Sequence, residues 1–327
     1  MALPKRGRTW NVRLRSRRVS LLYLFLTSAL LLLHHAYKRK FQRNGAHQDN
    51  WITEMHRLSD TKSQRSQGAQ DDYLGLIFEK IGTTNQFFVE FGFNEPSYTS
   101  GGSGANTWSL YDAGWRGLLL DGDRENAAIN LHAHFLFQDN IAQILRKYKV
   151  PSDLDYLSCD MDSHDLFVLK AILAAGFRPR VITTEYNANF PLGMSITQID
   201  PTLKSAQSTG YTFDFKQCAW GASASALRSV ASQFGYVLVG RIGYLDLVWL
   251  RDDLIDPSWN VPDFEWFFRD ADRLGQLHHQ PQVSEDIYNY ILDYASFQLD
   301  DDVDKAKASA KELLQASDLP CFRSVLQ

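Results

Sequence analysis

The stretch that decides the fold runs from Gln86 to Asp123 and reads QFFVEFGFNEPSYTSGGSGANTWSLYDAGWRGLLLDGD. It holds two short apolar runs, 86–92 and 116–123, separated by a loop rich in Gly, Ser and Thr. Near-continuous apolar runs of this length are typical of strands buried on both faces, as in a parallel sheet. Because residues 104–114 between them are a helix candidate, the stretch predicts a strand, a helix and a second strand.

The same alternation continues along the chain. Strand candidates lie at 154–162, 180–187, 235–243 and 244–253, and helix candidates lie at 124–133, 165–175 and 221–234. Regular alternation of this kind predicts a doubly wound α/β domain with a mainly parallel, Rossmann-like sheet. The last two strand candidates touch with almost no residues between them, so we expect them to pair as a C-terminal antiparallel hairpin.

The N-terminus reads as a membrane anchor. Residues 19–37, VSLLYLFLTSALLLLHHAY, carry no formal charge and are about long enough to span a bilayer as a helix. Seven Lys and Arg residues precede this segment and four follow it closely, which favours a cytosolic N-terminus and a type II orientation. A cleaved signal peptide and an organelle transit peptide remain alternatives. As a signal-anchor, so short a span suits the endoplasmic reticulum or Golgi membrane.

These patterns divide the chain into five parts: a basic cytosolic tail (1–18), the anchor (19–37), a polar stem (38–70), the α/β domain (71–255) and a C-terminal extension of helices (256–327). The formal net charge of -4 gives no indication of nucleic-acid binding. The three cysteines are odd in number and lack metal or redox spacing, so they support no disulfide scaffold.

Polar residues end the first two predicted strands. In an open parallel sheet, ligands bind outside the carboxyl ends of the strands, so these residues are the candidates for binding. The first strand ends at Glu90 and Gly92 and enters the loop that leads to Asn106; the second ends at Asp121. A glycine-bearing loop followed by an acid that can bind ribose hydroxyls indicates a ligand that contains a nucleoside. Neither G-x-G-x-x-G nor the Walker sequence occurs, which weighs against dinucleotides and ATP.

With the segments DYLSCDMDSHDLFVLKAIL and PRVITTEYNANFP, the opening stretch resembles the class I S-adenosylmethionine-dependent methyltransferases, in particular the FkbM-like branch. The resemblance covers about residues 75–255. It implies S-adenosylmethionine as cofactor and methyl transfer to an oxygen or nitrogen acceptor, which is a small molecule or a glycan. The residues it implies for cofactor binding are Glu90 and Gly92 near the methionine part, Asn106 in the first loop, Asp121 at the ribose, Asp139 or Asn140 at the adenine, and Asp160 facing the methyl group.

The acid-rich segment 155–165, DYLSCDMDSHD, has three readings. Asp162 or Ser163 can cap the helix candidate that follows, with Asp165 in its first turn. Asp160 and Asp162 can instead hold a divalent cation together with Glu185, because oxygen ligands suit magnesium or manganese. The third reading is a general base, which would be Asp160, Glu185 or His164. We take Asp160, Asp162 and Glu185 as catalytic candidates and assign no residue as a metal ligand.

Two other functions compete with methyl transfer. Asp160-Met161-Asp162 is an Asp-x-Asp triplet on a type II chain, as in many Golgi glycosyltransferases that hold manganese and a nucleotide sugar. Such enzymes do not need the Glu-x-Gly sequence or the acidic end of the second strand, so the methyltransferase reading is preferred. The other alternative is a non-catalytic adaptor, which would be favoured if side chains filled the cofactor pocket.

Overall fold

The computed structural model describes residues 50–63, 65–99, 105–203, 218–275, 283 and 288–326. They belong to one compact unit, Asp49–Gln327. The predicted basic tail (1–18), the predicted anchor (19–37) and the first part of the predicted stem lie outside the described residues. Within the ranges above, no helix has both the length and the apolar character that crossing a membrane requires.

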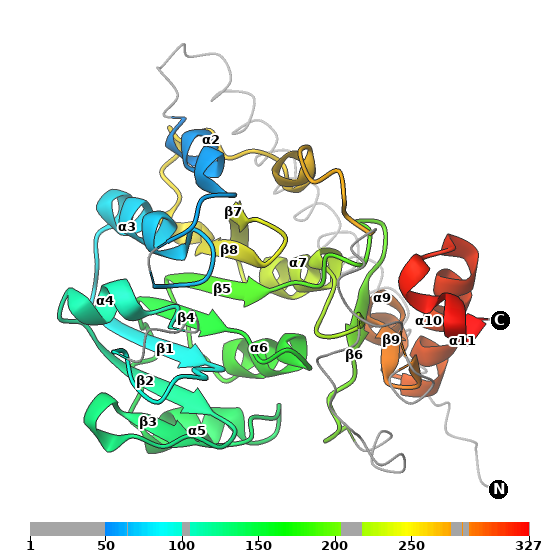
Figure 1. Cartoon of the computed structure of the whole chain (residues 1–327), viewed down its shortest axis with the longest axis horizontal. Coiled ribbons are helices and arrows are strands. Elements are labelled where there is room, and N and C mark those ends of the chain that lie inside the picture. The colour runs from blue at the N-terminus through cyan, green and yellow to red at the C-terminus, as the bar shows by residue number, and fades with distance from the viewer. Residues whose placement is uncertain are drawn as a thin grey trace, which may run out of the picture. The chain divides into compact units, whose positions relative to one another are not determined.

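Seven strands form the central sheet: β1 (Phe87–Phe91), β2 (Arg116–Asp121), β3 (Leu131–Ala133), β4 (Tyr156–Cys159), β5 (Val181–Glu185), β7 (Tyr236–Ile242) and β8 (Asp246–Arg251). Their order is β3-β2-β1-β4-β5-β8-β7 (Figure 1). The first five strands pair in parallel. β8 lies between β5 and β7 and is antiparallel to both. The mainly parallel Rossmann-like sheet and its antiparallel hairpin are therefore confirmed.

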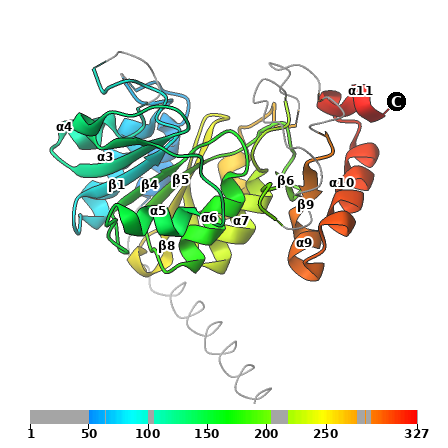
Figure 2. The same ribbon diagram turned by 90° about the horizontal axis from the view of Figure 1, so that it is seen from below.

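Helices cover both faces of this sheet (Figures 1 and 2). One face carries α3 (Gln70–Ile81) and α4 (Trp108–Asp112), and the other carries α5 (Ile141–Lys147), α6 (Asp165–Ala174) and α7 (Ala224–Gln233). α6 packs against both α5 and α7 and buries seven of its side chains. This explains why its sequence is apolar almost all the way round, as expected for a helix enclosed by neighbours.

The helix predicted over 124–133 is wrong. The segment instead forms a short 3-10 turn, η2 (Ala127–Ile129), followed by the edge strand β3. The side chain of Asn126 accepts a hydrogen bond from the backbone N–H of Ala128, and its backbone bonds that of Leu131. Because Asn126 turns the chain back on itself within five residues, no room remains for a helix.

Part of the predicted stem belongs to the folded unit. Residues 50–69 contain α2 (Trp51–Met55) and η1 (His56–Leu58), which contact the hairpin strand β7. Ile52 and Met55 are fully buried, and Trp51 is nearly so. The compact unit thus begins close to Asp49 rather than at Asp71.

The C-terminal extension contains a short strand as well as helices, and this strand pairs with one from the α/β domain. β6 (Ile196–Gln198) and β9 (Ile291–Asp293) pair antiparallel in a second sheet, beside a smaller apolar cluster that includes Phe190 and Phe322. The remaining elements are η3 (Asp252–Leu254), η4 (Phe264–Phe268), α9 (Tyr294–Asp300), α10 (Val303–Ser317), η5 (Pro320–Phe322) and α11 (Arg323–Leu326).

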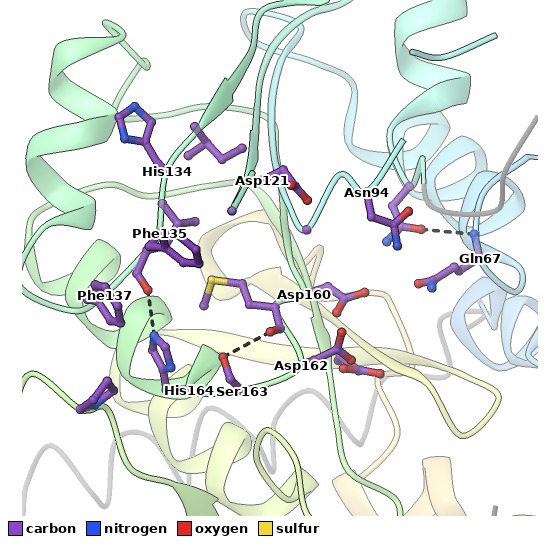
Figure 3. A pocket seen from close by; sticks show the side chains of 18 residues that line it. Gln67, Asn94, Asp121, His134, Phe135, Phe137, Asp160, Asp162, Ser163 and His164 are labelled. Atoms are coloured by element: carbon purple, nitrogen blue, oxygen red, sulfur yellow. Dashed lines mark hydrogen bonds between the residues drawn. The ribbon is translucent and has the colours of Figure 1, made fainter. Parts of the chain in front are cut away.

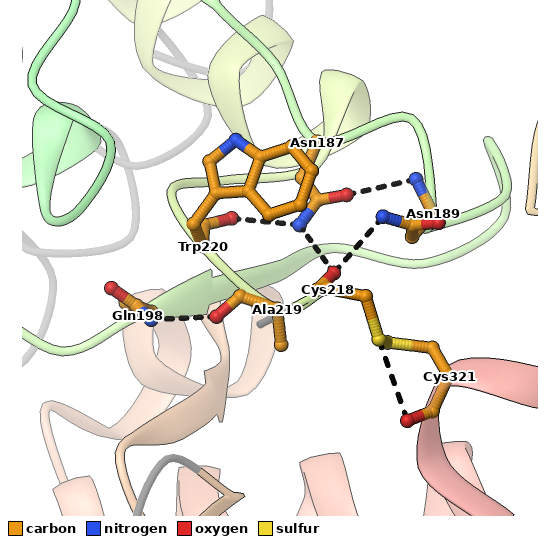
Figure 4. Close-up of a disulfide and its surroundings, with 7 residues drawn as sticks. All are labelled: Asn187, Asn189, Gln198, Cys218, Ala219, Trp220 and Cys321. Carbon is orange, nitrogen blue, oxygen red and sulfur yellow. Dashed lines mark hydrogen bonds between the residues drawn. A yellow bond between two sulfur atoms is a disulfide. The ribbon is translucent and has the colours of Figure 1, made fainter. Parts of the chain in front are cut away.

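A disulfide joins Cys218 to Cys321 within this cluster, with the two Cα atoms 6.0 Å apart (Figure 4). The cysteine pattern gave no support for it, because the two residues are 103 positions apart and follow no known spacing. The carbonyl oxygen of Cys218 accepts hydrogen bonds from the side chains of Asn187 and Asn189, which follow β5. The disulfide therefore ties the C-terminal extension to a loop at the carboxyl end of the main sheet.

Asp155, the first carboxylate of the acid-rich segment, lies at the opposite end of β4 from the others. It accepts hydrogen bonds from the backbone N–H groups of Thr84, Asn85 and Gln86 and from the guanidinium of Arg180. These hydrogen bonds and the ion pair with Arg180 hold the amino ends of β1 and β5 beside β4. Asp155 is a structural residue.

Candidate active site

A cavity of about 790 Å³ opens at the carboxyl ends of the parallel strands (Figure 3). It lies where the strand order reverses, with β1 flanked by β2 on one side and β4 on the other. The residues that line it are Gln67, Gly92, Asn94, Asn106, Leu120, Asp121, Gly122, His134, Phe135, Leu136, Phe137, Asp160, Met161, Asp162, Ser163, His164, Glu185 and Pro201. Six of the predicted site residues are among them: Gly92, Asn106, Asp121, Asp160, Asp162 and Glu185.

Gly92 forms the floor of the cavity at the end of β1. Its φ of +69° lies in the left-handed region. A Cβ atom built on this residue would collide with the backbone carbonyl of Asp160 at the end of β4. Glycine is therefore required here both for the turn and for the close approach of the two strand ends.

Glu90 does not line the cavity, although the resemblance placed it against the cofactor. Its side chain is completely buried and accepts hydrogen bonds from the backbone N–H groups of Asn106 and Thr107 and from the Thr107 hydroxyl. Burial raises the pKa of this carboxyl group to about 7. Glu90 thus holds the start of α4 against β1, and it acts on the cavity through Asn106.

Asp121 lines the cavity at the end of β2, as the sequence predicts for a ribose-binding acid. Its Oδ1 atom accepts hydrogen bonds from the backbone N–H groups of Asp123 and Arg124, at 3.0 and 3.2 Å. Burial raises the pKa of Asp121, and the two N–H groups oppose that shift. Figure 3 shows the carboxylate pointing toward the middle of the cavity.

Neither Asp139 nor Asn140 lines the cavity, so the predicted adenine contacts are not made there by these side chains. The Asn140 side chain bonds the backbone of Phe135 and Phe137 instead. Those two aromatic residues line the cavity, with Phe135 next to Gly122. The sequence does not mark them as wall residues, because a loop after an edge strand has no period that shows which side chains face a ligand.

His164 supports the same wall. It is buried, its ring lies parallel to that of Phe137 at 5.3 Å between centroids, and its Nε2 atom bonds the carbonyl of Leu136 at 2.8 Å. Asp165 accepts hydrogen bonds from the backbone N–H groups of Met161 and Ser163. These bonds shape the turn before α6, whose N-cap is His164. The capping expected from Asp162 or Ser163 does not occur.

Asp160, Asp162 and Glu185 form a carboxylate triad. One oxygen of each lies within 4.8 Å of one oxygen of the others. Asp160 follows β4, Glu185 ends β5, and Asp162 reaches the group because its backbone adopts φ +58°. Asp246 on β8 faces Glu185 across the sheet register and adds a fourth acid beside the triad.

The pKa values of the triad are raised. Burial is the largest cause for all three residues. Repulsion from Asp246 and Asp162 raises the pKa of Asp160 further, and repulsion from Asp160 and Asp162 does the same for Glu185. The triad therefore favours a bound proton or a bound cation.

The charged side chains that line the cavity are acidic. Four carboxylates line it, and no Lys or Arg does so among the residues that the structure describes. A ligand with a chain of phosphates would meet repulsion here, whereas a cationic ligand would be attracted.

No protein-family model matches the chain, and no curated protein matches it. Among solved structures, the chain is similar to an O-methyltransferase family protein from Burkholderia thailandensis, with a TM-score of 0.29 and 10% identical residues. The match covers 56% of this chain and 58% of that one. So slight a likeness carries no weight for activity.

Proposed function

We propose that the protein is an S-adenosylmethionine-dependent methyltransferase that acts on an oxygen or nitrogen acceptor. The observation that carries this proposal is the acidic cavity at the strand-order reversal, lined by four carboxylates and, within the described ranges, by no basic side chain. S-adenosylmethionine combines a nucleoside with a sulfonium, an ammonium and a carboxylate group, so it is positively charged overall, and it has no phosphate. Its charge therefore matches that of the cavity wall.

The nucleoside part is assigned to the side of the cavity formed by β2 and β3. Asp121 would accept hydrogen bonds from the ribose hydroxyls. Phe135 and Phe137 offer flat apolar surfaces for the adenine ring. Since Asp139 and Asn140 lie outside the wall, the aromatic pair replaces them in this role.

The triad is assigned to the acceptor. S-adenosylmethionine, when bound, supplies the methyl group. Asp160 or Glu185 would accept the proton that the acceptor hydroxyl or amine loses, and burial raises the pKa of each carboxyl group, which makes its carboxylate a stronger base.

A divalent cation is part of this proposal. Asp160, Asp162 and Glu185 offer three oxygen ligands within 4.8 Å of one another, a donor set that suits magnesium or manganese. A bound cation would neutralise the repulsion within the triad and would lower the pKa of an acceptor hydroxyl. The same triplet is the feature that favours the second candidate, a manganese-dependent glycosyltransferase.

The cavity has a volume of about 790 Å³ and is not filled by side chains. This favours a protein that binds a ligand over a non-catalytic adaptor with a filled pocket. Its size suits a cofactor together with an acceptor, which we propose to be a small molecule or a glycan.

Calorimetry on the purified chain separates the two enzymatic candidates. We expect S-adenosylhomocysteine to bind the unmodified chain, and Asp121→Ala to weaken that binding by about tenfold or more. Asp112→Ala is the control, since its side chain is exposed and does not line the cavity. If UDP binds only in the presence of manganese and S-adenosylhomocysteine does not bind, the result would favour the glycosyltransferase function instead.

We also propose that residues 19–37 anchor the chain as a single-pass type II protein of the Golgi or endoplasmic reticulum. The disulfide between Cys218 and Cys321 supports this, because such bonds persist in oxidising compartments such as the secretory lumen. In isolated microsomes, a C-terminal epitope tag should resist added protease until detergent is present. Digestion of the tag in intact vesicles would reject the orientation.

A further inference from the structure

The cavity has two chemically different ends (Figure 3). Phe135 and Phe137 lie on one side and the amide side chains of Gln67 and Asn94 on the other, with Asp160 and Asp162 between them. The amide end also includes Asn106. If the aromatic end takes the nucleoside, the remainder of the ligand extends toward the amides.

Gln67 comes from a segment that precedes the α/β domain predicted from the sequence. We call residues 65–69 the N-terminal strap. The backbone N–H of Gln67 donates a hydrogen bond to Oδ1 of Asn106 at 3.2 Å. Arg65 lies over the ring of Trp108, 4.6 Å from its centroid, and so fixes the strap on one side of Gln67.

The other side of the strap is fixed as firmly. Ser66 Oγ accepts a hydrogen bond from the backbone N–H of Asp71. Gln70, the first residue of α3, is fully buried and donates from Nε2 to Asp246 at 2.7 Å. Gln67 is therefore presented to the cavity by a segment with little freedom to move.

The side-chain oxygen of Gln67 is buried and has no hydrogen-bond partner among the residues that the structure describes. A buried carbonyl oxygen without a partner is costly, and its presence at a cavity indicates that a ligand supplies the donor. The four carboxylates of the wall favour a donor that carries positive charge.

We propose that the Gln67 side-chain oxygen accepts a hydrogen bond from the α-ammonium group at the amino-acid end of S-adenosylmethionine. This rests on the proposed function. It makes the N-terminal strap a part of the cofactor site and gives it a role in selecting cofactors that carry the amino-acid end.

Two ligands test this on the full chain by calorimetry: S-adenosylhomocysteine, which has the ammonium group, and 5′-methylthioadenosine, which keeps the nucleoside and lacks the amino-acid end. The variant Gln67→Met has almost the same shape without the polar atoms. We expect it to bind S-adenosylhomocysteine about 10- to 100-fold more weakly, as for loss of a hydrogen bond to a charged group, and to bind 5′-methylthioadenosine as the unmodified chain does.

Gln143→Met, at an exposed position of α5, is the matched control and should leave both affinities unchanged. If Gln67→Met does not fold, Gln67→Asn replaces it with the same expectations, because it withdraws the amide by one methylene. Unchanged binding of S-adenosylhomocysteine overturns the inference, and so does an equal loss for both ligands, which would mean a change of cavity shape. If the unmodified chain binds neither ligand, the proposed function itself fails.

Discussion

Gly92 is the residue on which the cavity floor depends, because β1 and β4 meet there without space for a side chain. We predict that Gly92→Ala destabilises the protein by about 2–4 kcal/mol, since left-handed strain adds to a clash with the Asp160 backbone. Gly114→Ala is the control: φ there is also positive, at +85°, but a Cβ atom would have nothing within 4 Å. Urea unfolding should show a loss of roughly 1–2 kcal/mol for the control. Equal losses of unfolding free energy in the two variants would contradict the close approach of Gly92 to the Asp160 backbone.

Residues that end apolar runs could be predicted from sequence, and residues whose role depends on a loop conformation could not. Asp121 and Asp160 were found because a carboxylate that ends a buried strand stands out in the pattern. Asn140 was assigned to adenine, yet its amide is used up by the backbone of its own loop. Gln67 gave no signal, because it lies in a polar segment with no period and becomes a wall residue only through contacts with distant positions such as Asn106.

Glu90 leads to a prediction about pH. Its pKa rises from 4.5 to about 7 because of burial. A carboxyl group whose pKa is higher in the folded state stabilises the fold below its unfolded pKa, and this contribution is lost as the pH rises through the folded pKa. Between pH 4.5 and 7, Glu90 should therefore cost the protein about 2–3 kcal/mol.

The measurement is the free energy of unfolding from pH 4.5 to 8 for the unmodified chain and for Glu90→Gln. The pH dependence should be shallower in Glu90→Gln, because the amide does not titrate. Glu79→Gln, exposed on α3, is the control and should follow the unmodified chain. Parallel curves for all three proteins would show that Glu90 does not carry the effect.

At the scale of elements, the buried strands were predictable and the edge of the sheet was not. β4 and β5 are enclosed on both faces, and burial selects mostly apolar and β-branched residues there, which mark both segments as strands. β3 pairs with one neighbour only and is three residues long, with a single buried side chain. With one buried side chain, β3 shows no alternation of apolar and polar residues that would predict a strand. The turn before it depends on the single side chain of Asn126, which composition does not reveal.

The C-terminal elements depend on the disulfide. A bond between Cys218 and Cys321 closes a loop of about 100 residues, for which loss should cost roughly 2–5 kcal/mol. Thermal unfolding of the unmodified chain should shift to lower temperature with a thiol reductant. The variant with Cys218→Ser and Cys321→Ser should unfold at that lower temperature with or without reductant.

Peptide mass spectrometry under non-reducing conditions provides the direct check, since it should recover the Cys218–Cys321 link. Cys159, buried on β4, should be recovered as a free thiol. A linked Cys159 would contradict the pairing. Because Cys218 also accepts hydrogen bonds from Asn187 and Asn189, reduction should loosen the loop that follows Glu185.

At the scale of the whole molecule, the boundary of the folded unit is the point where sequence and structure differ most. Composition placed the start of the domain at Asp71, because residues 50–70 are polar overall. A few apolar residues in that segment nevertheless bury against the hairpin, among them Trp51, Ile52 and Met55. Composition averages over a segment, whereas packing depends on individual side chains. A short segment that packs through a few apolar residues therefore resembles a polar linker in its composition.

This boundary gives the last prediction. A chain that begins at Asn50 should unfold cooperatively and bind S-adenosylhomocysteine, whereas one that begins at Asp71 should be largely unfolded. Burying one large apolar side chain contributes about 1.5–3 kcal/mol, so the loss of several approaches the total stability of a typical domain, roughly 5–15 kcal/mol. The shorter chain also lacks Gln67 and Gln70, and with them the hydrogen bonds to Asn106 and Asp246.

Circular dichroism during heating measures the difference between the two chains. Ile52→Ala in the longer chain is the informative comparison, since Ile52 is fully buried and the substitution should cost about 2–5 kcal/mol without removing the strap. Lys62→Ala, at an exposed position in the same segment, should leave the unfolding temperature unchanged. If the chain from Asp71 unfolds at the same temperature as the chain from Asn50, residues 50–70 are a stem after all, and Gln67 has no fixed place at the cavity.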